Sequence, residues 1–174
     1  NCLLRWGTDA QKETYAPRMA ADTVGAYALS EATSGSDAFG LRTRAEKKGD
    51  RYVIHGRKWF ITGADGAAHF ILMARTSNDP RRGLTAFLHH KDQPGWRIVR
   101  RIPIMAPEEI GGACELEFDG LEIPAENLLM EEGDGLRITQ MRLGPARLTH
   151  CMRWLGLSKR CLEIAGAYVK ERMA

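Results

Sequence analysis

The feature that most constrains the fold is a series of short strand-like segments between residues 25 and 124, with no helical segment between them. Gly and Asp or Asn punctuate the series, most clearly at Lys48-Gly49-Asp50 and Asn78-Asp79-Pro80, and Gly56-Arg57-Lys58 reads as a further turn. Strands at such short spacing favour an antiparallel barrel or sandwich. The expected strands are residues 41–47, 52–54, 59–62, 70–76, 84–89, 96–102, 114–118 and 121–123.

The first 24 residues have a helical pattern instead. Thr8 or Asp9 can cap a helix there, because a short oxygen-bearing side chain accepts bonds from the first free N–H groups of a helix. Pro17 is expected to break or kink this helix. The segment therefore predicts helices that precede the β-domain.

Residues 133–174 also have apolar side chains at helical spacing. Pro145 predicts a kink, and two helices that meet near Pro145 or Gly156 are an alternative. The chain thus divides into residues 1–24, 25–132 and 133–174. It starts with Asn and stops inside a helical pattern, so we expect an internal piece of a longer protein.

Composition excludes several classes of function. The net charge of +3 gives no electrostatic case for nucleic-acid binding, and no apolar run is long enough to span a membrane. The histidines show no metal-ligand spacing, and no GxGxxG motif indicates a nicotinamide site. The cysteines lack CxxC spacing and are read as reduced thiols of a cytosolic-type compartment; they are Cys2, Cys114, Cys151 and Cys161.

Residues 27–40, YALSEATSGSDAFG, are the most informative stretch for function. A strand runs into a loop of small hydroxyl residues and glycines, which can bring N–H and hydroxyl donors close to a flat polar ligand or a phosphate. An ordinary surface turn is the alternative from composition alone. Glu31 and Asp37 are unsuited to contact a bare anion and are expected to hold the backbone of the loop.

This stretch resembles the first signature of the acyl-CoA dehydrogenase family of flavoproteins. All specified positions are filled; they are Ala28, Leu29, Ser30, Glu31, Ser34, Gly35, Ser36, Asp37 and Gly40. Ala32 stands where the family often has Pro. The resemblance implies an α+β multidomain fold: the end of an α-helical N-terminal domain, an antiparallel β-barrel middle domain, and the start of a helical C-terminal domain.

The family resemblance places FAD against this loop. Ser30 would bond the pyrimidine side of the flavin, although a strand hydroxyl that bonds a neighbouring carbonyl is an alternative. Ser36 would lie where the FAD pyrophosphate and acyl-CoA meet. The flavin contacts implied here are Tyr27, Leu29, Ser30, Gly35 and Ser36.

Residues 58–63, KWFITG, are similar to the second flavin segment of the family. Phe60, Ile61 and Thr62 would lie along the flavin, with the Thr62 hydroxyl able to donate to flavin N5. Trp59 and Phe60 point to opposite sides of a strand, so which one faces the ring stays open. Without the resemblance, both aromatics would be assigned to a barrel core.

Further contacts are implied in residues 133–174. Leu143 and Arg147 resemble substrate contacts on a helix that lines the acyl-CoA site, and Arg172 resembles an arginine that reaches the FAD pyrophosphate of a neighbouring subunit. Gly144 and Pro145 depart from the family pattern. For Arg147 and Arg172, an exposed helical arginine is the alternative.

The implied function is FAD-dependent α,β-dehydrogenation of an acyl-CoA thioester in fatty-acid metabolism. The α-proton is abstracted by a carboxylate, which most of the family carries beyond the position of Ala174 and a minority at the position of Ala146. No catalytic residue is therefore named, and this chain alone is expected to be inactive.

The resemblance also implies a homo-oligomer, dimer or tetramer, and reoxidation by an electron-transferring flavoprotein. The compartment would be the bacterial cytoplasm or the mitochondrial matrix. The alternatives are a relative of the acyl-CoA oxidase type that uses oxygen, and a flavin-free fragment with a structural or interaction role.

Overall fold

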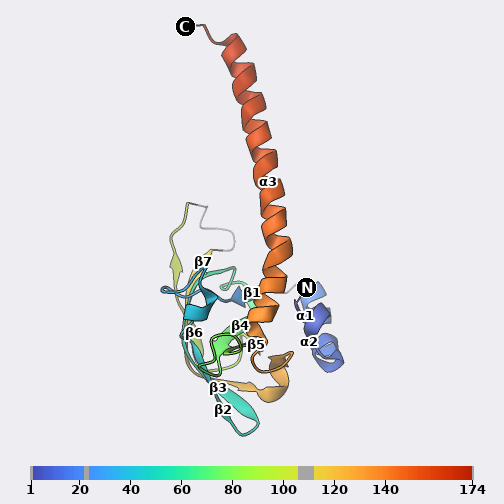
Figure 1. Cartoon of the computed structure of the whole chain (residues 1–174), viewed down its shortest axis with the longest axis vertical. Coiled ribbons are helices and arrows are strands. Elements are labelled where there is room, and N and C mark those ends of the chain that lie inside the picture. The colour runs from blue at the N-terminus through green and yellow to red at the C-terminus, as the bar shows by residue number, and fades with distance from the viewer. Residues whose placement is uncertain (1, 22–23, 106–111, 174) are drawn as a thin grey trace. The chain divides into compact units, whose positions relative to one another are not determined.

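The computed structural model describes residues 2–21, 24–105 and 112–173. Its contacts define two compact units, Asn1–Ile138 and Thr139–Ala174. The first unit contains two helices, α1 (Cys2–Trp6) and α2 (Asp9–Ala21), and an eight-stranded sheet (Figure 1). The second unit consists of the greater part of α3 (Gly135–Glu171) and the residues after it.

Helix α2 begins with a reciprocal cap. The Gln11 N–H donates to Thr8 Oγ1 at 3.2 Å and the Thr8 N–H donates to Gln11 Oε1 at 3.0 Å, which confirms Thr8 as a capping residue. Gln11 Nε2 also donates to the carbonyls of Glu126 and Leu128, so it fastens the helix to the sheet unit. The helix does not break at Pro17 but continues to Ala21, because the ring removes a single donor near the helix end.

The sheet follows one pairing path, β6-β7-β3-β2-β4-β5-β8, with β1 paired to β4 off this path. Two 3₁₀ turns, η1 (Ala38–Gly40) and η2 (Ala125–Asn127), lie in the connections. The strands are β1 (Val24–Ala28), β2 (Arg44–Lys48), β3 (Arg51–Thr62), β4 (Ala67–Arg75), β5 (Leu84–His90), β6 (Trp96–Ile102), β7 (Ala113–Pro124) and β8 (Leu128–Leu129).

The pairing corrects the prediction of a purely antiparallel barrel. β1 runs parallel to β4, and β2 meets β4 in parallel at Arg44 and Arg75. A long connection makes this possible: the loop after β1 and the β2–β3 hairpin let the chain enter β4 in the direction of β1. Among the described residues, the recorded pairs do not join the two ends of the path, so the sheet is mixed and open there.

The interpretation of residues 56–58 as a turn is wrong, because β3 runs unbroken through them. Gly56 has φ +148°, and a Cβ at this position would lie 2.7 Å from Thr43 Cα. The glycine therefore permits the close approach of two chains rather than a reversal. The turn at Lys48-Gly49-Asp50 is confirmed, since it joins β2 to β3 with Gly49 at φ +63°.

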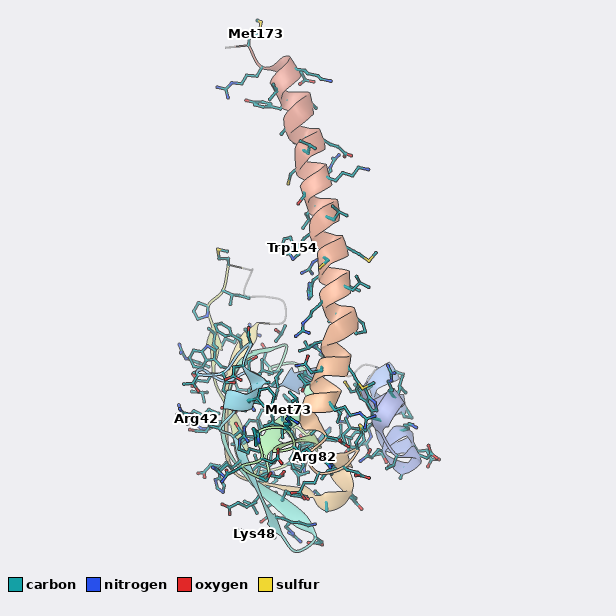
Figure 2. The ribbon with its side chains drawn as sticks, in the orientation of Figure 1. Arg42, Lys48, Met73, Arg82, Trp154 and Met173 are labelled. Carbon is teal, nitrogen blue, oxygen red and sulfur yellow. The ribbon has the colours of Figure 1, made fainter. Side chains whose placement is uncertain are left out.

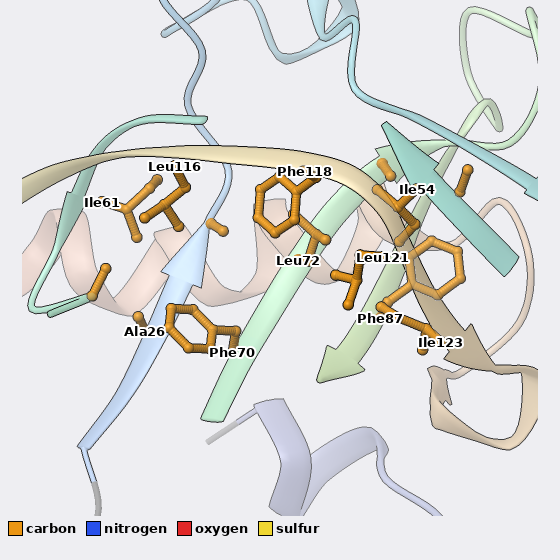
Figure 3. Close-up of a cluster of buried hydrophobic side chains, with 14 of the residues drawn as sticks. Ala26, Ile54, Ile61, Phe70, Leu72, Phe87, Leu116, Phe118, Leu121 and Ile123 are labelled. Atoms are coloured by element: carbon orange, nitrogen blue, oxygen red, sulfur yellow. The ribbon is translucent and has the colours of Figure 1, made fainter. Parts of the chain in front are cut away.

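Aromatic and aliphatic side chains from β1, β3, β4, β5 and β7 fill the main core (Figure 3). Phe70, Phe87 and Phe118 are fully buried there, and burial of each contributes about 1.5–3 kcal/mol. The ring of His89 stacks on Phe70 with centroids 4.6 Å apart. A second cluster, which includes Met73 and Leu129, packs beneath α1 and α2.

Helix α3 is continuous from Gly135 to Glu171, through both Pro145 and Gly156. The alternative of two separate helices is thus wrong, because a proline costs one hydrogen bond and the surrounding turns retain theirs. After Thr139, apolar residues recur every three, four or seven positions, and their side chains are exposed in the described part of the chain. This stripe consists of Leu148, Met152, Leu155, Leu162 and Val169. No helix among the described residues combines the length and apolarity of a membrane span.

Candidate functional site

The loop between β1 and β2 is held by its own hydrogen bonds. Glu31 and Ser34 exchange backbone bonds of 2.9 and 3.1 Å, and Ser34 Oγ donates to the Asp37 carbonyl. Asp37 Oδ1 accepts the Phe39 N–H at 3.0 Å and so caps η1. The expected backbone role of Asp37 is confirmed, and the loop is a fixed structure rather than a loose surface turn.

Glu31 is the centre of this arrangement. Its Oε2 accepts the Arg42 N–H at 2.7 Å, and its Oε1 accepts the Thr43 N–H at 3.0 Å and the Thr43 hydroxyl at 2.6 Å. Lys58 Nζ donates to the same Oε1 at 2.9 Å and to the Leu29 carbonyl at 3.0 Å. We call Glu31, Thr43 and Lys58 the anchor cluster. The expected backbone role of Glu31 is confirmed, with an ion pair in addition.

Burial and charge oppose each other in the anchor cluster. Lys58 is 0% exposed, and desolvation lowers its pKa to about 8 although the carboxylate of Glu31 favours the charged form. Burial alone would raise the pKa of Glu31, but Lys58 and the bonds from Thr43 and Arg42 outweigh burial, so that pKa lies below its ordinary value. Both residues therefore stay ionised at neutral pH as a buried ion pair.

The end of β3 is bulged. Between the pairs Lys58–Leu116 and Ile61–Cys114, β3 carries one residue more than β7. Phe60 lies in this bulge with φ +56° and is 51% exposed. A non-glycine residue in this region carries strain of about 1–3 kcal/mol, and such strain clusters at functional sites.

Phe60 is thus the aromatic that faces outward. Trp59 is partly buried: its ring meets Phe60 edge-on at 5.8 Å, and the guanidinium of Arg100 lies 5.1 Å from its centroid. The Trp59 N–H donates to the Ser30 carbonyl at 2.8 Å. This bond brings the two segments that resemble flavin-binding signatures side by side.

Several polar groups near these segments have no recorded hydrogen-bond partner in the described part of the chain. Among the described residues, the hydroxyls of Ser30, Ser36 and Thr62 take part in no recorded hydrogen bond. With the exposed ring of Phe60, they offer donors and an aromatic face, the combination that a flat heteroaromatic group with a polar edge requires. We call Ser30, Ser36, Phe60 and Thr62 the rim residues.

The remaining predicted contacts of this unit are placed differently. Ile61 is 2% exposed and its side chain is part of the main core (Figure 3). Tyr27 and Leu29 are partly buried and pack against the second core cluster. Gly35 is exposed, with open space where a Cβ would project. The side chain of Ile61 is therefore unavailable to a ligand, whereas Gly35 could contribute only its backbone.

A pocket of about 500 Å³ opens beside the loop. The guanidinium of Arg75 is held by the carbonyls of Phe39, Leu41 and Ser77, and Arg44 Nη2 donates to Asn78 Oδ1 at 3.4 Å. No recorded bond among the described residues involves the Arg42 side chain, which Figure 2 shows at the surface. The lining residues are Phe39, Leu41, Arg42, Arg44, Arg75, Asn78 and Pro80.

The predicted contacts of α3 belong to the second unit, which is described by itself. Leu143 is partly buried and Arg147 is exposed. Arg172 follows the end of the helix, where its Nη1 donates to Tyr168 Oη at 3.4 Å and its guanidinium lies over that ring.

The sequence reasoning missed two residues. The turn expected at residues 56–58 includes Lys58, whereas alternation from Tyr52 and Ile54 indicates the buried face of β3, where Lys58 lies. Arg42, which lines the pocket, is not among the predicted contacts. Its signal was the alternation of Arg42 and Arg44 directly after the signature.

Comparison of this chain with known protein families and solved structures shows which family it belongs to. Residues 26–121 match the family described as acyl-CoA dehydrogenase, middle domain, and residues 133–174 match acyl-CoA dehydrogenase, C-terminal domain. The chain therefore belongs to the acyl-CoA dehydrogenase family, a family of flavoprotein oxidoreductases.

Individual relatives show the same likeness. The chain is 38% identical to an acyl-CoA dehydrogenase of Bacillus subtilis, over 99% of this chain and 46% of the relative. It is 37% identical to the mitochondrial short/branched chain specific acyl-CoA dehydrogenase of Rattus norvegicus, over 96% of this chain and 39% of the relative. The structure of butyryl-CoA dehydrogenase from Megasphaera elsdenii matches with a TM-score of 0.89 at 34% identity, over 100% of this chain and 46% of that one. The chain thus spans less than half of the length of these relatives.

Proposed function

We propose that the protein with this chain is an FAD-dependent dehydrogenase that converts an acyl-CoA thioester into its α,β-unsaturated form. The observation that carries the proposal is the set of rim residues, unpartnered hydroxyls beside an outward-facing aromatic, in a chain of this family. FAD supplies the acceptor for the β-hydride when it is bound.

The rim residues would hold the flavin. The hydroxyls of Ser30 and Thr62 can donate to its polar edge, and Phe60 can exclude water from one side. Ile61 would contribute through its backbone, since its side chain is buried. The other proposed cofactor contacts are Tyr27, Leu29, Gly35, Ser36 and Arg172.

The pocket beside the loop, which is lined by Arg42, Arg44 and Arg75, would receive the phosphate groups of the acyl-CoA. Arg42 and Arg44 line it, and guanidinium groups bind phosphate through paired N–H donors. Its lining begins at Phe39, shortly after Ser36 in the sequence, and Ser36 is the residue proposed to lie where FAD and substrate meet. Leu143 and Arg147 are the proposed substrate contacts of α3.

No described residue is assigned as the catalytic base. Glu31 is held in the anchor cluster and Asp37 caps η1, so neither carboxylate is available to accept an α-proton. A homo-oligomer and an electron-transferring flavoprotein as acceptor are further parts of the proposal. The bacterial and mitochondrial relatives support either compartment.

The test uses the intact product of the gene that encodes this chain. We expect the purified protein to show a visible flavin absorption band that survives desalting, and the band to bleach when an acyl-CoA is added without oxygen. A colourless protein that takes up no added FAD would refute the proposal and favour a structural role. Bleached protein that recovers its colour at once in air would instead indicate an oxidase.

Variants assign the site. Thr62→Ala and Ser30→Ala remove unpartnered rim hydroxyls and should weaken FAD binding, whereas Thr33→Ala removes a hydroxyl of the same loop outside the rim and should not. Arg42→Ala should raise the KM for acyl-CoA and leave FAD affinity unchanged. Equal effects of Thr33→Ala and Ser30→Ala on FAD affinity would contradict the assignment.

A further inference from the structure

We propose that Lys58 is a positioning residue. It holds the two segments that carry the rim residues, 27–40 and 58–63, in a fixed position relative to each other, so that the cofactor binds to a preformed surface. This inference rests on the proposed function. The structure supplies the geometry: the side chain leaves β3 two residues before Phe60 and ends at the carbonyl of Leu29, one residue before Ser30. One side chain therefore connects both rim segments.

A second set of bonds, through Glu31, supports this connection. Lys58 Nζ reaches Glu31 Oε1 at 2.9 Å, and Glu31 in turn holds the N–H groups of Arg42 and Thr43. The loop is thus fastened to β3 by Lys58 at Leu29 and Glu31, and by the Thr43 hydroxyl, which donates to the Arg57 carbonyl of β3 at 3.4 Å. The rim hydroxyls of Ser30 and Ser36 lie in the stretch that these contacts enclose.

Stability alone does not account for this lysine. A buried ion pair loses the hydration of both charges, and apolar side chains of similar volume stabilise a fold at least as well. Directional bonds are what an apolar residue cannot supply. Here those bonds end on the Leu29 carbonyl and on Glu31, the two groups that set the path of the loop backbone.

Four forms of the intact gene product test the inference: wild type, Lys58→Met, the double variant Lys58→Met/Glu31→Gln, and Lys48→Met as control. Met keeps the length of the side chain without its donors. The double variant also removes the charge that Lys58→Met would leave unpaired, so it serves if the single variant fails to fold. Lys48 is exposed at the end of β2, and its side chain takes part in no recorded bond among the described residues.

The measurements are amide hydrogen exchange along the chain, the dissociation constant of FAD, and the fine structure of the visible band of bound flavin. In Lys58→Met and in the double variant we expect faster exchange in residues 29–43 and 59–62 and unchanged exchange in β4 and β5. The FAD dissociation constant of both should be about tenfold higher than in the wild type. The flavin band should lose the fine structure of a fixed environment. Lys48→Met should match the wild type.

The outcomes separate this inference from the proposed function. Unchanged exchange in residues 29–43 overturns the inference, and so does faster exchange with unaltered FAD binding and an unaltered band, because Lys58 would then stabilise the loop without positioning the cofactor. A wild-type protein that binds no FAD overturns the proposed function, and the cofactor role of Lys58 with it, whatever the exchange data show.

Discussion

Lys58 and Phe60 lie two positions apart on β3 and differ in nearly every respect. Lys58 is fully buried, ionised and bonded to two groups, whereas Phe60 is half exposed, strained at φ +56° and next to hydroxyls without partners. The anchor cluster satisfies the polar groups of the loop, and the rim residues leave theirs available. The difference shows how one loop can be held by the bonds of the anchor cluster and still have hydroxyls available to bind a ligand.

Neither region is best explained by stability. The anchor cluster removes two charges from water, and the rim keeps an aromatic residue in a backbone conformation that suits glycine. Features that cost free energy in the folded chain are expected where the chain has a function. The following predictions test whether the two regions are as separate as this comparison implies.

The largest expected effect concerns Gly56, which lets β3 approach the anchor cluster. In Gly56→Ala the new Cβ would lie 2.7 Å from Thr43 Cα at φ +148°, so we expect a loss of about 3–4 kcal/mol in the free energy of unfolding. Gly49→Ala has open space at φ +63° and should lose about 1 kcal/mol. Urea titrations measure both, and equal losses would show that the close approach is unimportant.

His89 is buried and is paired with no carboxylate among the described residues, so it should make the sheet unit sensitive to acid. Burial lowers the pKa of His89 to about 4, and the imidazoles of His90 and His69 oppose its protonation further; Phe70, Trp96 and Phe118 surround its ring. The unfolded chain takes up this proton near pH 6.5 and the folded chain only near pH 4. His89 should therefore not lower the free energy of unfolding above pH 6.5. As the pH drops to 4, the free energy of unfolding should fall by up to about 3 kcal/mol.

Urea titrations at several pH values measure how steeply the free energy of unfolding falls with pH, which we call the pH slope. His89→Phe keeps an aromatic ring on Phe70 and should remove most of the slope, while a smaller part persists because burial also lowers the pKa of His69. An unchanged slope in His89→Phe would assign the acid sensitivity to other groups, such as Glu31 in the anchor cluster.

Phe60→Gly should separate stability from binding at the rim. Glycine adopts φ +56° without strain, so this variant should be more stable by about 0.5–1 kcal/mol, although it loses an aromatic side chain. Its affinity for FAD should fall. Phe39→Gly, at an exposed phenylalanine outside the left-handed region, should instead be less stable. A destabilised Phe60→Gly would mean that the ring packs more firmly than its exposure indicates.

The smallest effect is expected for the ion pairs between β6 and β7. Arg97 Nε donates to Glu117 Oε2 at 2.7 Å, and Arg57 contacts the same carboxylate at the surface. Since solvent and salt screen such pairs, Arg97→Ala should shift the urea midpoint only slightly, and the shift should vanish at high salt. A shift as large as that of Gly56→Ala would contradict this.

The sequence was sufficient for those parts of the fold that depend on local pattern. Most strand positions, the turn at Gly49, the cap at Thr8 and the backbone roles of Glu31 and Asp37 follow from periodicity and turn chemistry. The expected strands 52–54 and 59–62 are the single strand β3, and 114–118 and 121–123 are the single strand β7. These features need only neighbours along the chain.

Features that depend on distant contacts were not predictable in the same way. The parallel pairing of β1 with β4 and the continuity of α3 through Pro145 are set by packing and by helix cooperativity, which single positions do not reveal. At the site, the small hydroxyls were found from the signature, but the burial of Lys58 depends on Leu29 and Glu31, which lie far from it in the sequence.

The arginines of β6 have a consequence for how copies of the chain meet. In the described sheet, β6 ends the pairing path, so one side of it has no recorded strand partner. Such an edge can template the addition of a strand from another molecule, and charged side chains oppose this. Arg97, Arg100 and Arg101 hold their charges in place through Glu117, Glu115 and Asp65. The arginine side chains are 52–64% exposed, so they place charge along the edge at which a further strand would add.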